Sequence, residues 1–324
     1  MFDTKRISCE EYMVGLNYYL RDTVSSTSGS HICVCIPTYK RLQMLKGLLT
    51  KLQGQRTDGL FTYSVLVVDN DSNLSARDLV MEIRERALIH INYCVAEEKN
   101  VAVARNVAVQ NAIGELIAFI DDDETPVDDW LLNLFKVYKA YKVDGVLGPV
   151  KPVFGKPPPD WVVKAKLFER PSYETGLILR WDCTRTGNVL LRRNIFDESD
   201  NLFNPEFKHS EDRDFFRRII RKGFIFVWCD EAPVYETEMP ERFKIKYFLK
   251  RALVRGNASM RHRRFSKASI MKSAIAILVY TSALPFLFLI GQHLFILYMI
   301  KLFDHIGALM AVFKFDLVNY FGGA

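Results

Sequence analysis

Residues 115–124 read Glu-Leu-Ile-Ala-Phe-Ile-Asp-Asp-Asp-Glu, an apolar run that ends in four consecutive acids. Adjacent carboxylates repel one another and raise each other's pKa unless a cation neutralises them. Carboxylate oxygens favour magnesium, manganese or calcium over zinc. The run therefore predicts a divalent-metal site at the end of a buried strand. The alternative at this point is a solvated acidic turn in front of a helix.

Apolar strands alternate with helices in the sequence before this stretch. Strands are predicted at 31–36, 63–68, 89–95 and 115–120, and helices at 42–53, 74–87 and 100–112. This order is typical of a parallel sheet with right-handed crossovers, in which ligands bind beyond the carboxyl ends of the strands. Polar residues follow three of those ends, at 37–39, at Asp69 and at 121–123. A solvated turn does not explain this convergence.

The second half of the chain changes in character. Residues 125–128 have the pattern of a capping box with proline at the first helical position, which predicts a helix through about Tyr141. Residues 148–159 are rich in proline and glycine and predict a connection between two halves. Further on, Thr186-Gly187-Asn188 precedes an apolar strand, and Ser210-Glu211-Asp212 opens a helix that ends before a strand at 224–229.

Composition and charge narrow the class of protein. The 324 residues carry a net charge of +6, much of it between 244 and 272, which favours an anionic membrane surface over nucleic acid. No zinc-spaced Cys/His set and no basic stripe with interleaved aromatic residues supports nucleic-acid binding. The six cysteines form no C-x-x-C pair and are expected to be reduced. Near the N-terminus we expect no cleaved signal peptide, a short amphipathic helix at 10–21 and a serine-rich linker.

The C-terminal part is predicted to associate with a membrane. Residues 240–264 are basic and helical in character, and two apolar segments follow at 273–290 and 294–313. Each approaches the ~20 residues that span a bilayer, although polar residues interrupt both. The arginines at 261, 263 and 264 fit a cytoplasmic flank. Two crossings, a shallow position in one leaflet, and a buried hairpin in a soluble protein remain open.

As a set, these motifs resemble the family 2 glycosyltransferases of the GT-A fold. The matching residues are Ile36-Pro37-Thr38-Tyr39, Val67-Val68-Asp69-Asn70, Ala104-Arg105-Asn106, Phe119-Ile120-Asp121-Asp122-Asp123-Glu124, Thr186-Gly187-Asn188 and Ser210-Glu211-Asp212. The similarity covers about residues 31–264, and the order and spacing of the motifs make it specific. The basic stretch 240–256 is also similar to the bacterial exopolysaccharide branch of the succinoglycan type.

The resemblance implies an α/β GT-A nucleotide-diphospho-sugar transferase fold, with a mixed, mostly parallel sheet and a C-terminal helical membrane-associated segment. The implied organisation is an extension and linker at 1–30, a nucleotide-sugar-binding half at 31–150, an acceptor and catalytic-base half at 151–240, basic juxtamembrane helices at 241–272, and an apolar helical hairpin at 273–324.

The resemblance also implies a role for individual residues. The donor-binding residues are Pro37, Thr38, Tyr39, Asp69, Arg105, Asp121 and Asp122, with Thr38 and Asp69 at the base. Asp121 and Asp123 would hold Mg²⁺ or Mn²⁺, Asp123 directly. Gly187, Asn188 and Glu211 would bind the acceptor, and Asp212 would be the catalytic base.

Two departures from the family pattern stand out. Glu236 occupies a position where related sequences often have histidine. The Q-x-x-R-W signature of processive polysaccharide synthases is absent from the sequence, which favours the addition of one sugar per encounter.

The implied function is an inverting, metal-dependent transfer of one sugar from a UDP-sugar to a saccharide acceptor carried on polyprenyl diphosphate. It would take place at the cytoplasmic face of the inner membrane, in bacterial surface or exopolysaccharide biosynthesis. From the residues alone, Asp69 and Asn188 can also be structural turn residues. Glu211 and Asp212 can also be present because acids in the first turn of a helix interact favourably with the helix dipole. A nucleotidyltransferase, which would need glycines in the loop at 38–41, and a non-enzymatic membrane scaffold are the alternative functions.

Overall fold

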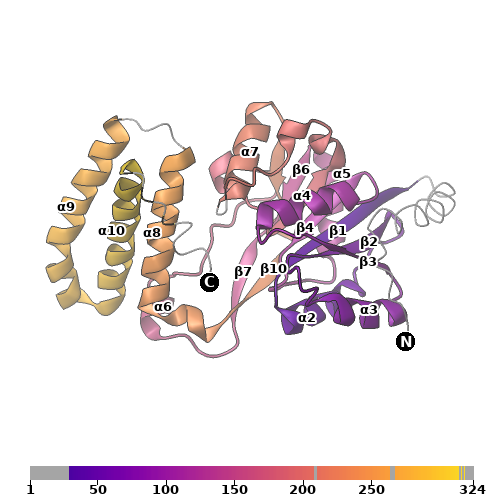
Figure 1. Cartoon of the computed structure of the whole chain (residues 1–324), viewed down its shortest axis with the longest axis horizontal. Helices are drawn as coiled ribbons and strands as arrows, with labels where there is room; N and C mark the ends of the chain where they lie inside the picture. The colour runs from indigo at the N-terminus through magenta and orange to yellow at the C-terminus, as the bar shows by residue number, and fades with distance from the viewer. Residues whose placement is uncertain (1–28, 208–209, 263–266, 314, 316, 318–324) are drawn as a thin grey trace.

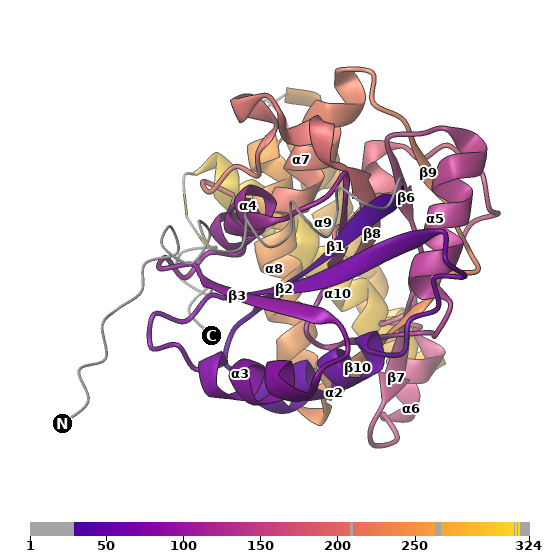
Figure 2. The same ribbon diagram turned by 90° about the vertical axis from the view of Figure 1, so that its right-hand side faces the viewer.

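A seven-stranded sheet forms the centre of the computed structural model, which describes residues 29–207, 210–262, 267–313, 315 and 317. The predicted helix at 10–21 and Cys9 lie outside the described residues. The order of the strands is β3-β2-β1-β4-β8-β6-β9 (Figure 2). They are β1 (Ser30–Thr38), β2 (Phe61–Asp69), β3 (His90–Val95), β4 (Leu116–Ile120), β6 (Gly145–Leu147), β8 (Asn188–Arg192) and β9 (Phe226–Trp228).

Most neighbouring strands of this sheet are parallel. β1 pairs in parallel with β2 and β4, whereas β8 runs antiparallel to both β4 and β6. Thr38 lies opposite Asp69, and Ile120 lies opposite Asn188. The carboxyl ends of β1, β2 and β4 therefore meet the start of β8 at one edge, and the mixed, mostly parallel sheet implied by the resemblance is confirmed.

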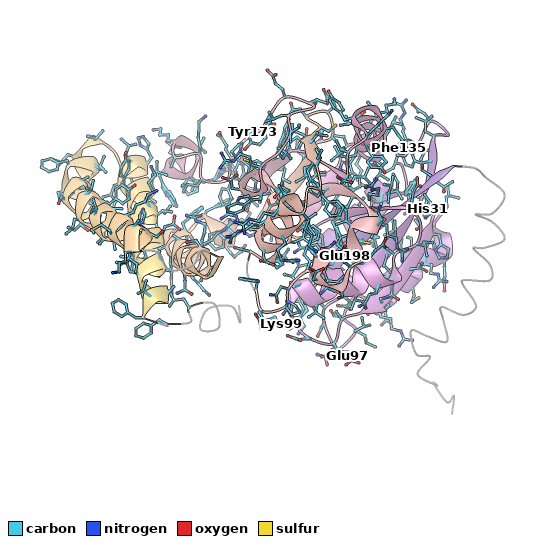
Figure 3. All side chains as sticks on the ribbon, turned by 90° about the horizontal axis from the view of Figure 1, so that it is seen from above. His31, Glu97, Lys99, Phe135, Tyr173 and Glu198 are labelled. Carbon is cyan, nitrogen blue, oxygen red and sulfur yellow. The ribbon has the colours of Figure 1, made fainter. Side chains whose placement is uncertain are left out.

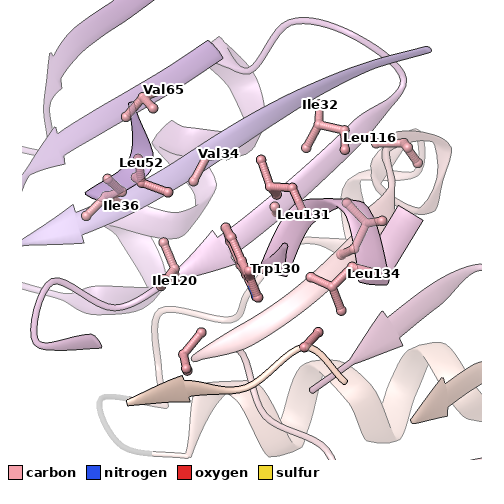
Figure 4. Close-up of a cluster of buried hydrophobic side chains, with 14 of the residues drawn as sticks. Ile32, Val34, Ile36, Leu52, Val65, Leu116, Ile120, Trp130, Leu131 and Leu134 are labelled. Carbon is pink, nitrogen blue, oxygen red and sulfur yellow. The ribbon is translucent and has the colours of Figure 1, made fainter. Parts of the chain in front are cut away.

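Helices cover both faces of the sheet (Figure 2). One face carries α2 (Leu42–Leu52), α3 (Arg77–Arg86) and α5 (Trp130–Tyr141), and the other carries α4 (Val101–Asn111) and α7 (Glu211–Arg221). Ile32, Val34 and Ile36 of β1 point into the first core, beside Trp130 (Figure 4). Cys33 and Cys35 point into the second. Burial on both faces explains why these strands are apolar without alternation.

A second, three-stranded sheet corrects one sequence prediction. Residues predicted to start a helix form the strand β5 (Glu124–Pro126), and α5 begins only at Trp130. β5 pairs antiparallel with β10 (Val234–Glu238), which pairs in parallel with β7 (Val150–Phe154). The helix start predicted at 125–128 was wrong because this long-range pairing outweighs a local capping preference. The glycine- and proline-rich connection likewise contains a strand, β7.

Short helices complete the part of the molecule around the two sheets. They are α6 (Asp160–Lys164), η1 (Trp181–Cys183), η2 (Arg193–Phe196), η3 (Ser199–Asn201) and η4 (Pro240–Phe243). None of the five cysteines within the described ranges forms a disulfide, as expected for reduced residues.

Three long helices follow β10 and η4. They are α8 (Ile245–His262), α9 (Lys267–Ile290) and α10 (Gln292–Val312), and α10 lies between the other two (Figure 1). By length and composition, α9 and α10 are the two helices in the described ranges that could cross a membrane. Phe154, Val162, Phe243 and Ile296 belong to one apolar cluster, which joins these helices to the sheets.

The opposite end of β1 carries a buried histidine, His31. Its two ring nitrogens lie 2.7 Å from the Thr62 hydroxyl and 2.9 Å from the Ser64 hydroxyl. Gly114, at φ +91°, packs so closely that a Cβ atom there would lie 2.7 Å from the imidazole. Burial and, to a lesser degree, nearby His90 lower the pKa of His31 to about 4. His31 lies at the end of the molecule away from the C-terminal helices (Figure 3).

Candidate active site

The acidic segment, residues 121–124, is surrounded by arginines. The Thr38 hydroxyl donates to Asp122 at 2.8 Å, and Arg41 Nη1 lies 2.9 Å from both Asp122 and Asp123. Arg242 Nη2 lies 3.2 Å from Asp123. Burial raises the pKa of Asp122 to about 6, and Arg41 opposes this rise. Three of the four acids are therefore buried and the segment is paired with cations, unlike a solvated turn.

Arg105 connects this segment to the start of α7. Its helix, α4, begins at Asn100, whose side chain accepts from Ala102 N as predicted. Arg105 Nη2 lies 3.3 Å from Asp121 Oδ1, and Nη1 pairs with Glu211. Arg105 is buried, and within the described ranges its Nε has no hydrogen-bond partner. One guanidinium thus joins the end of β4 to the acids that open α7.

Glu211 and Asp212 differ in their surroundings. Glu211 is buried against Arg105, and burial raises its pKa to about 7 although the guanidinium opposes the shift. Asp212 is partly exposed, and its Oδ1 accepts from Arg213 N at 2.7 Å. Of the two acids, Asp212 is the one whose carboxylate remains accessible next to the site.

The end of β2 lies next to the end of β1, where Asp69 pairs with Thr38, the residue that contacts the acidic segment. Asp69 is fully buried, and its carboxylate accepts from Asp71 N at 3.0 Å, Ala76 N at 2.7 Å and the Tyr93 hydroxyl at 3.0 Å. These bonds shape the loop after β2. Contact of Asp69 with a nucleotide base stays a prediction.

Tyr39 continues the same edge after the buried end of β1, which contains Pro37. Its half-buried ring has the Lys40 ammonium 5.2 Å and the Lys99 ammonium 4.6 Å from the centroid. Two cations on one aromatic ring make this edge electropositive, which suits an anionic nucleotide.

Gly187 precedes β8 and Asn188 is the first residue of that strand, and the two residues have different surroundings. A Cβ atom on Gly187 would lie 2.6 Å from Glu124 Oε1 and 3.2 Å from Asp121 Oδ2, so this backbone passes directly against the acidic segment. Asn188 is fully buried. Its amide donates to Pro149 O at 3.0 Å and Ala232 O at 2.8 Å, and accepts from Trp130 Nε1 at 2.8 Å. Acceptor binding by Asn188 stays a prediction.

Glu236, the departure from the family pattern, pairs with Glu124 across the β5/β10 ladder. It forms an ion pair with Arg170 and lies 3.3 Å from Arg242 Nη1. Two arginines therefore hold a carboxylate where related sequences often have histidine.

The donor set fits a metal ion that is shared with a diphosphate. Asp121 is partly exposed, and Glu124 beside it is buried among carboxylates that raise its pKa together with burial, the larger cause. Within the described residues, no group of three or more His, Cys, Asp or Glu side chains is arranged to hold an ion alone. Mg²⁺ commonly uses one or two protein carboxylates together with substrate phosphates, and the partly exposed Asp121 is a carboxylate of this kind, whereas Asp123 is paired with Arg41 and Arg242.

Sequence reasoning assigned no role to Arg41, Arg170 or Arg242. Four adjacent acids at a strand end need several cations, but spacing along the chain does not show which arginines come close. Arg242 is 119 residues from Asp123 in sequence.

Sequence similarity connects this chain with known proteins. The family model for Glycosyl transferase family 2 matches residues 33–199. The succinoglycan biosynthesis protein ExoM of Rhizobium meliloti (strain 1021) is 32% identical over 231 residues, which cover 68% of this chain and 71% of ExoM.

The chain belongs to glycosyltransferase family 2.

More distant relatives support the fold of this family 2 glycosyltransferase. The poly(ribitol-phosphate) beta-N-acetylglucosaminyltransferase TarS of Staphylococcus aureus (strain MW2) is 24% identical over 63% of this chain, a match that spans 35% of TarS. The crystal structure of S. aureus TarS 1-349 in complex with UDP-GlcNAc superposes with a TM-score of 0.52 at 18% identity, covering 90% of this chain and 92% of that one. The GT-A fold implied by the motifs is confirmed.

Proposed function

We propose that this glycosyltransferase moves one sugar from a UDP-sugar to a saccharide acceptor, with inversion at the anomeric carbon. The observation that carries the proposal is Arg105, which contacts Asp121 at the end of β4 and Glu211 at the start of α7. A donor diphosphate beside Asp121 and an acceptor beside Asp212 would then lie on either side of one guanidinium. The TarS neighbours solved with UDP and with UDP-GlcNAc support a uridine donor.

The donor would bind along the edge formed by Pro37, Thr38, Tyr39 and Asp69, with its diphosphate toward Arg105 and the acidic segment. The lysines around Tyr39 and the arginines at 41 and 242 supply positive charge there. Asp121 and Asp123 would hold Mg²⁺ or Mn²⁺, which supplies Lewis-acid neutralisation of the departing diphosphate. Asp122 would orient Thr38 and Arg41, the two side chains that it binds.

Asp212 would take the proton from the attacking hydroxyl of the acceptor. Glu211 is the less suitable base because Arg105 already occupies its carboxylate. Glu211 would instead keep Arg105 in place, while the lack of a side chain at Gly187 lets this backbone pack directly against Asp121 and Glu124. Attack from the face opposite the leaving group inverts the anomeric centre.

The acceptor would be a saccharide on polyprenyl diphosphate, at the cytoplasmic face of the cell membrane. Two features support this: the apolar helices α9 and α10, and the relative ExoM, which is named a succinoglycan biosynthesis protein. We therefore assign the chain to bacterial surface or exopolysaccharide synthesis.

The test compares two acids in the first turn of α7, Asp212→Asn and Asp214→Asn. Both substitutions remove a charge that favours the helix dipole, but Asp214 pairs with Arg218 on its own helix at 2.7 Å. We expect Asp212→Asn to lower UDP-sugar-dependent transfer to extracted lipid-linked saccharides by ~10²- to 10⁴-fold, and Asp214→Asn to retain it. Equal activity of the two variants would remove Asp212 as the base.

A thermal-shift panel tests the donor side independently. UDP with Mg²⁺ or Mn²⁺ should raise the melting temperature more than GDP, CDP or dTDP do, because a bound ligand stabilises the native state. Asp123→Ala should lose the metal-dependent part of that rise. A rise that is the same without metal would contradict the role of Asp121 and Asp123.

A further inference from the structure

Helix α9 presents an apolar surface that nothing else in the described structure covers. Met271, Leu278 and Leu289 are 63%, 69% and 83% exposed. They lie on one side of the helix, because seven and eleven residues each correspond to nearly whole turns. Phe288 and Ile290 are also exposed, at 65% and 68%, and project about 200° apart. Near the C-terminal end of α9 the exposed apolar surface is therefore wider than the single stripe of a helix pair.

Helix α10, in contrast, contacts α6 and α8 as well as α9. Near its start, Ile296 belongs to the cluster that contains Val162 of α6 and Phe248 of α8. Further along, Asp304 pairs with Arg255 of α8 through two bonds, one of them 2.9 Å long. Near its end, Gly307 packs against Leu253 so closely that a Cβ atom would lie 2.1 Å from the Leu253 carbonyl oxygen.

Helix α8 is the reason that α10 does not suit a transmembrane position. Lys246, Arg251 and Arg255 of α8 are exposed, and the helix has no acidic residue. Charged side chains are costly in the hydrocarbon core. If α9 and α10 crossed the bilayer as a hairpin, α10 would have to take α8 and α6 with it or lose its contacts with both.

We propose that helices α8–α10 bind a single leaflet of an anionic membrane, with α9 lying parallel to the surface among the acyl chains. Because α10 lies between α9 and α8 (Figure 1), it would rest above α9, and α8 would lie at the level of the lipid headgroups. This inference rests on the membrane association in the proposed function and gives it a geometry. Lys267 and Lys272 of α9 and the basic residues of α8 match negatively charged headgroups.

The proposed orientation can be tested by measuring how deep successive positions of α9 lie in the bilayer. Three cysteine variants are labelled with an environment-sensitive fluorophore: Met271→Cys, Leu278→Cys and Leu289→Cys. In each of them, Cys9 and Cys183 are changed to serine. The protein is added to vesicles of phosphatidylcholine and phosphatidylglycerol in which lipid-borne quenchers sit at known depths. Met271 and Leu289 are about 27 Å apart along the helix, close to the thickness of the hydrocarbon core.

We expect the same shallow depth at all three positions. A depth at Leu278 that is near the bilayer centre, with Met271 and Leu289 near opposite surfaces, would overturn the proposal in favour of a crossing hairpin.

A second pair of variants tests the surface itself. Leu278→Glu should lower flotation with the same vesicles by about tenfold or more, whereas Leu88→Glu, at a leucine 95% exposed before β3, should not. If Leu278→Glu instead leaves flotation intact, or turns a lipid-free dimer into a monomer, α9 has another partner and the proposal fails. Leu278→Glu should keep hydrolysis of the UDP-sugar, and Asp212→Asn should keep flotation, so failure of the membrane geometry and failure of the proposed chemistry are distinguishable.

Discussion

Arg242 Nη2 lies 3.2 Å from Asp123 Oδ2, so the segment that leads into α8 directly contacts the acidic segment at the end of β4. The same guanidinium lies 3.0 Å from Glu238 and 3.3 Å from Glu236. Glu238 is only 2% exposed. Three carboxylates from two separate stretches of the chain therefore share one arginine.

Arg242→Ala should destabilise the protein and weaken donor binding together. Loss of the guanidinium leaves buried Glu238 without its cation, a change that costs on the order of 3 kcal/mol in unfolding free energy. Denaturant unfolding and the KM for the UDP-sugar measure the two effects. Lys246→Ala, which removes an exposed cation of α8, is the matched control. A variant with the wild-type unfolding free energy would show that the pairing contributes little.

Gly187→Ala should impair transfer more than stability. The added Cβ would lie 2.6 Å from Glu124 Oε1 and displace that carboxylate from the Asp121 backbone N–H, to which it is bonded at 3.0 Å. We expect kcat/KM to fall by about tenfold or more, since small displacements in an active site are costly. Gly155→Ala, where nothing lies within 4 Å of the added atom, should behave as wild type. Unchanged kinetics at position 187 would argue against a site beside β8.

Asn188→Ala should lower the unfolding free energy by about 2–4 kcal/mol, because Trp130 Nε1 and two buried carbonyl oxygens lose their partner. Urea unfolding followed by tryptophan fluorescence gives this quantity. Asn194→Ala, at an exposed asparagine in η2, should change it little. If position 188 instead alters only the KM for the acceptor, its role is in substrate binding.

His31 should make the stability of the protein depend on pH between about 4 and 6.5. Its pKa is depressed in the folded state, so in this range the unfolded chain binds more protons and stability falls as the pH is lowered. A shift of this size corresponds to about 3 kcal/mol. Unfolding free energies at pH 7 and pH 4.5 should differ less for His31→Gln than for wild type. The same pH dependence in both proteins would assign it to other groups.

The strands and the edge at which they end could be predicted because their signals are local. Apolar runs of five to six residues followed by Thr38, Asp69 and Asp121 indicate buried parallel strands and a common edge. The helix from Asn100 was also correct, since its cap depends only on Ala102 two residues away.

The parts that could not be predicted depend on distant partners. β5 is a strand because β10, more than 100 residues later, pairs with it. Arg242 and Asp123 are likewise far apart in sequence, and no periodicity connects them. Asn188 has the pattern of a turn residue. In the structure its buried amide instead donates hydrogen bonds from β8 to the carbonyl oxygens of Pro149 and Ala232.

In β10, Glu236 lies beside Glu124. The strand is followed after one residue by η4, and η4 is followed after one residue by α8. Thr237 N also donates to Asp123 O at 2.9 Å, so this connection is bonded directly to the acidic segment. With α9 seated in a leaflet, the reacting groups would stand at one constant height above the lipid. We therefore expect the protein to select carbohydrate chains by how far their terminal sugar extends from the bilayer. Glycans one or two units too short or too long should be poor substrates.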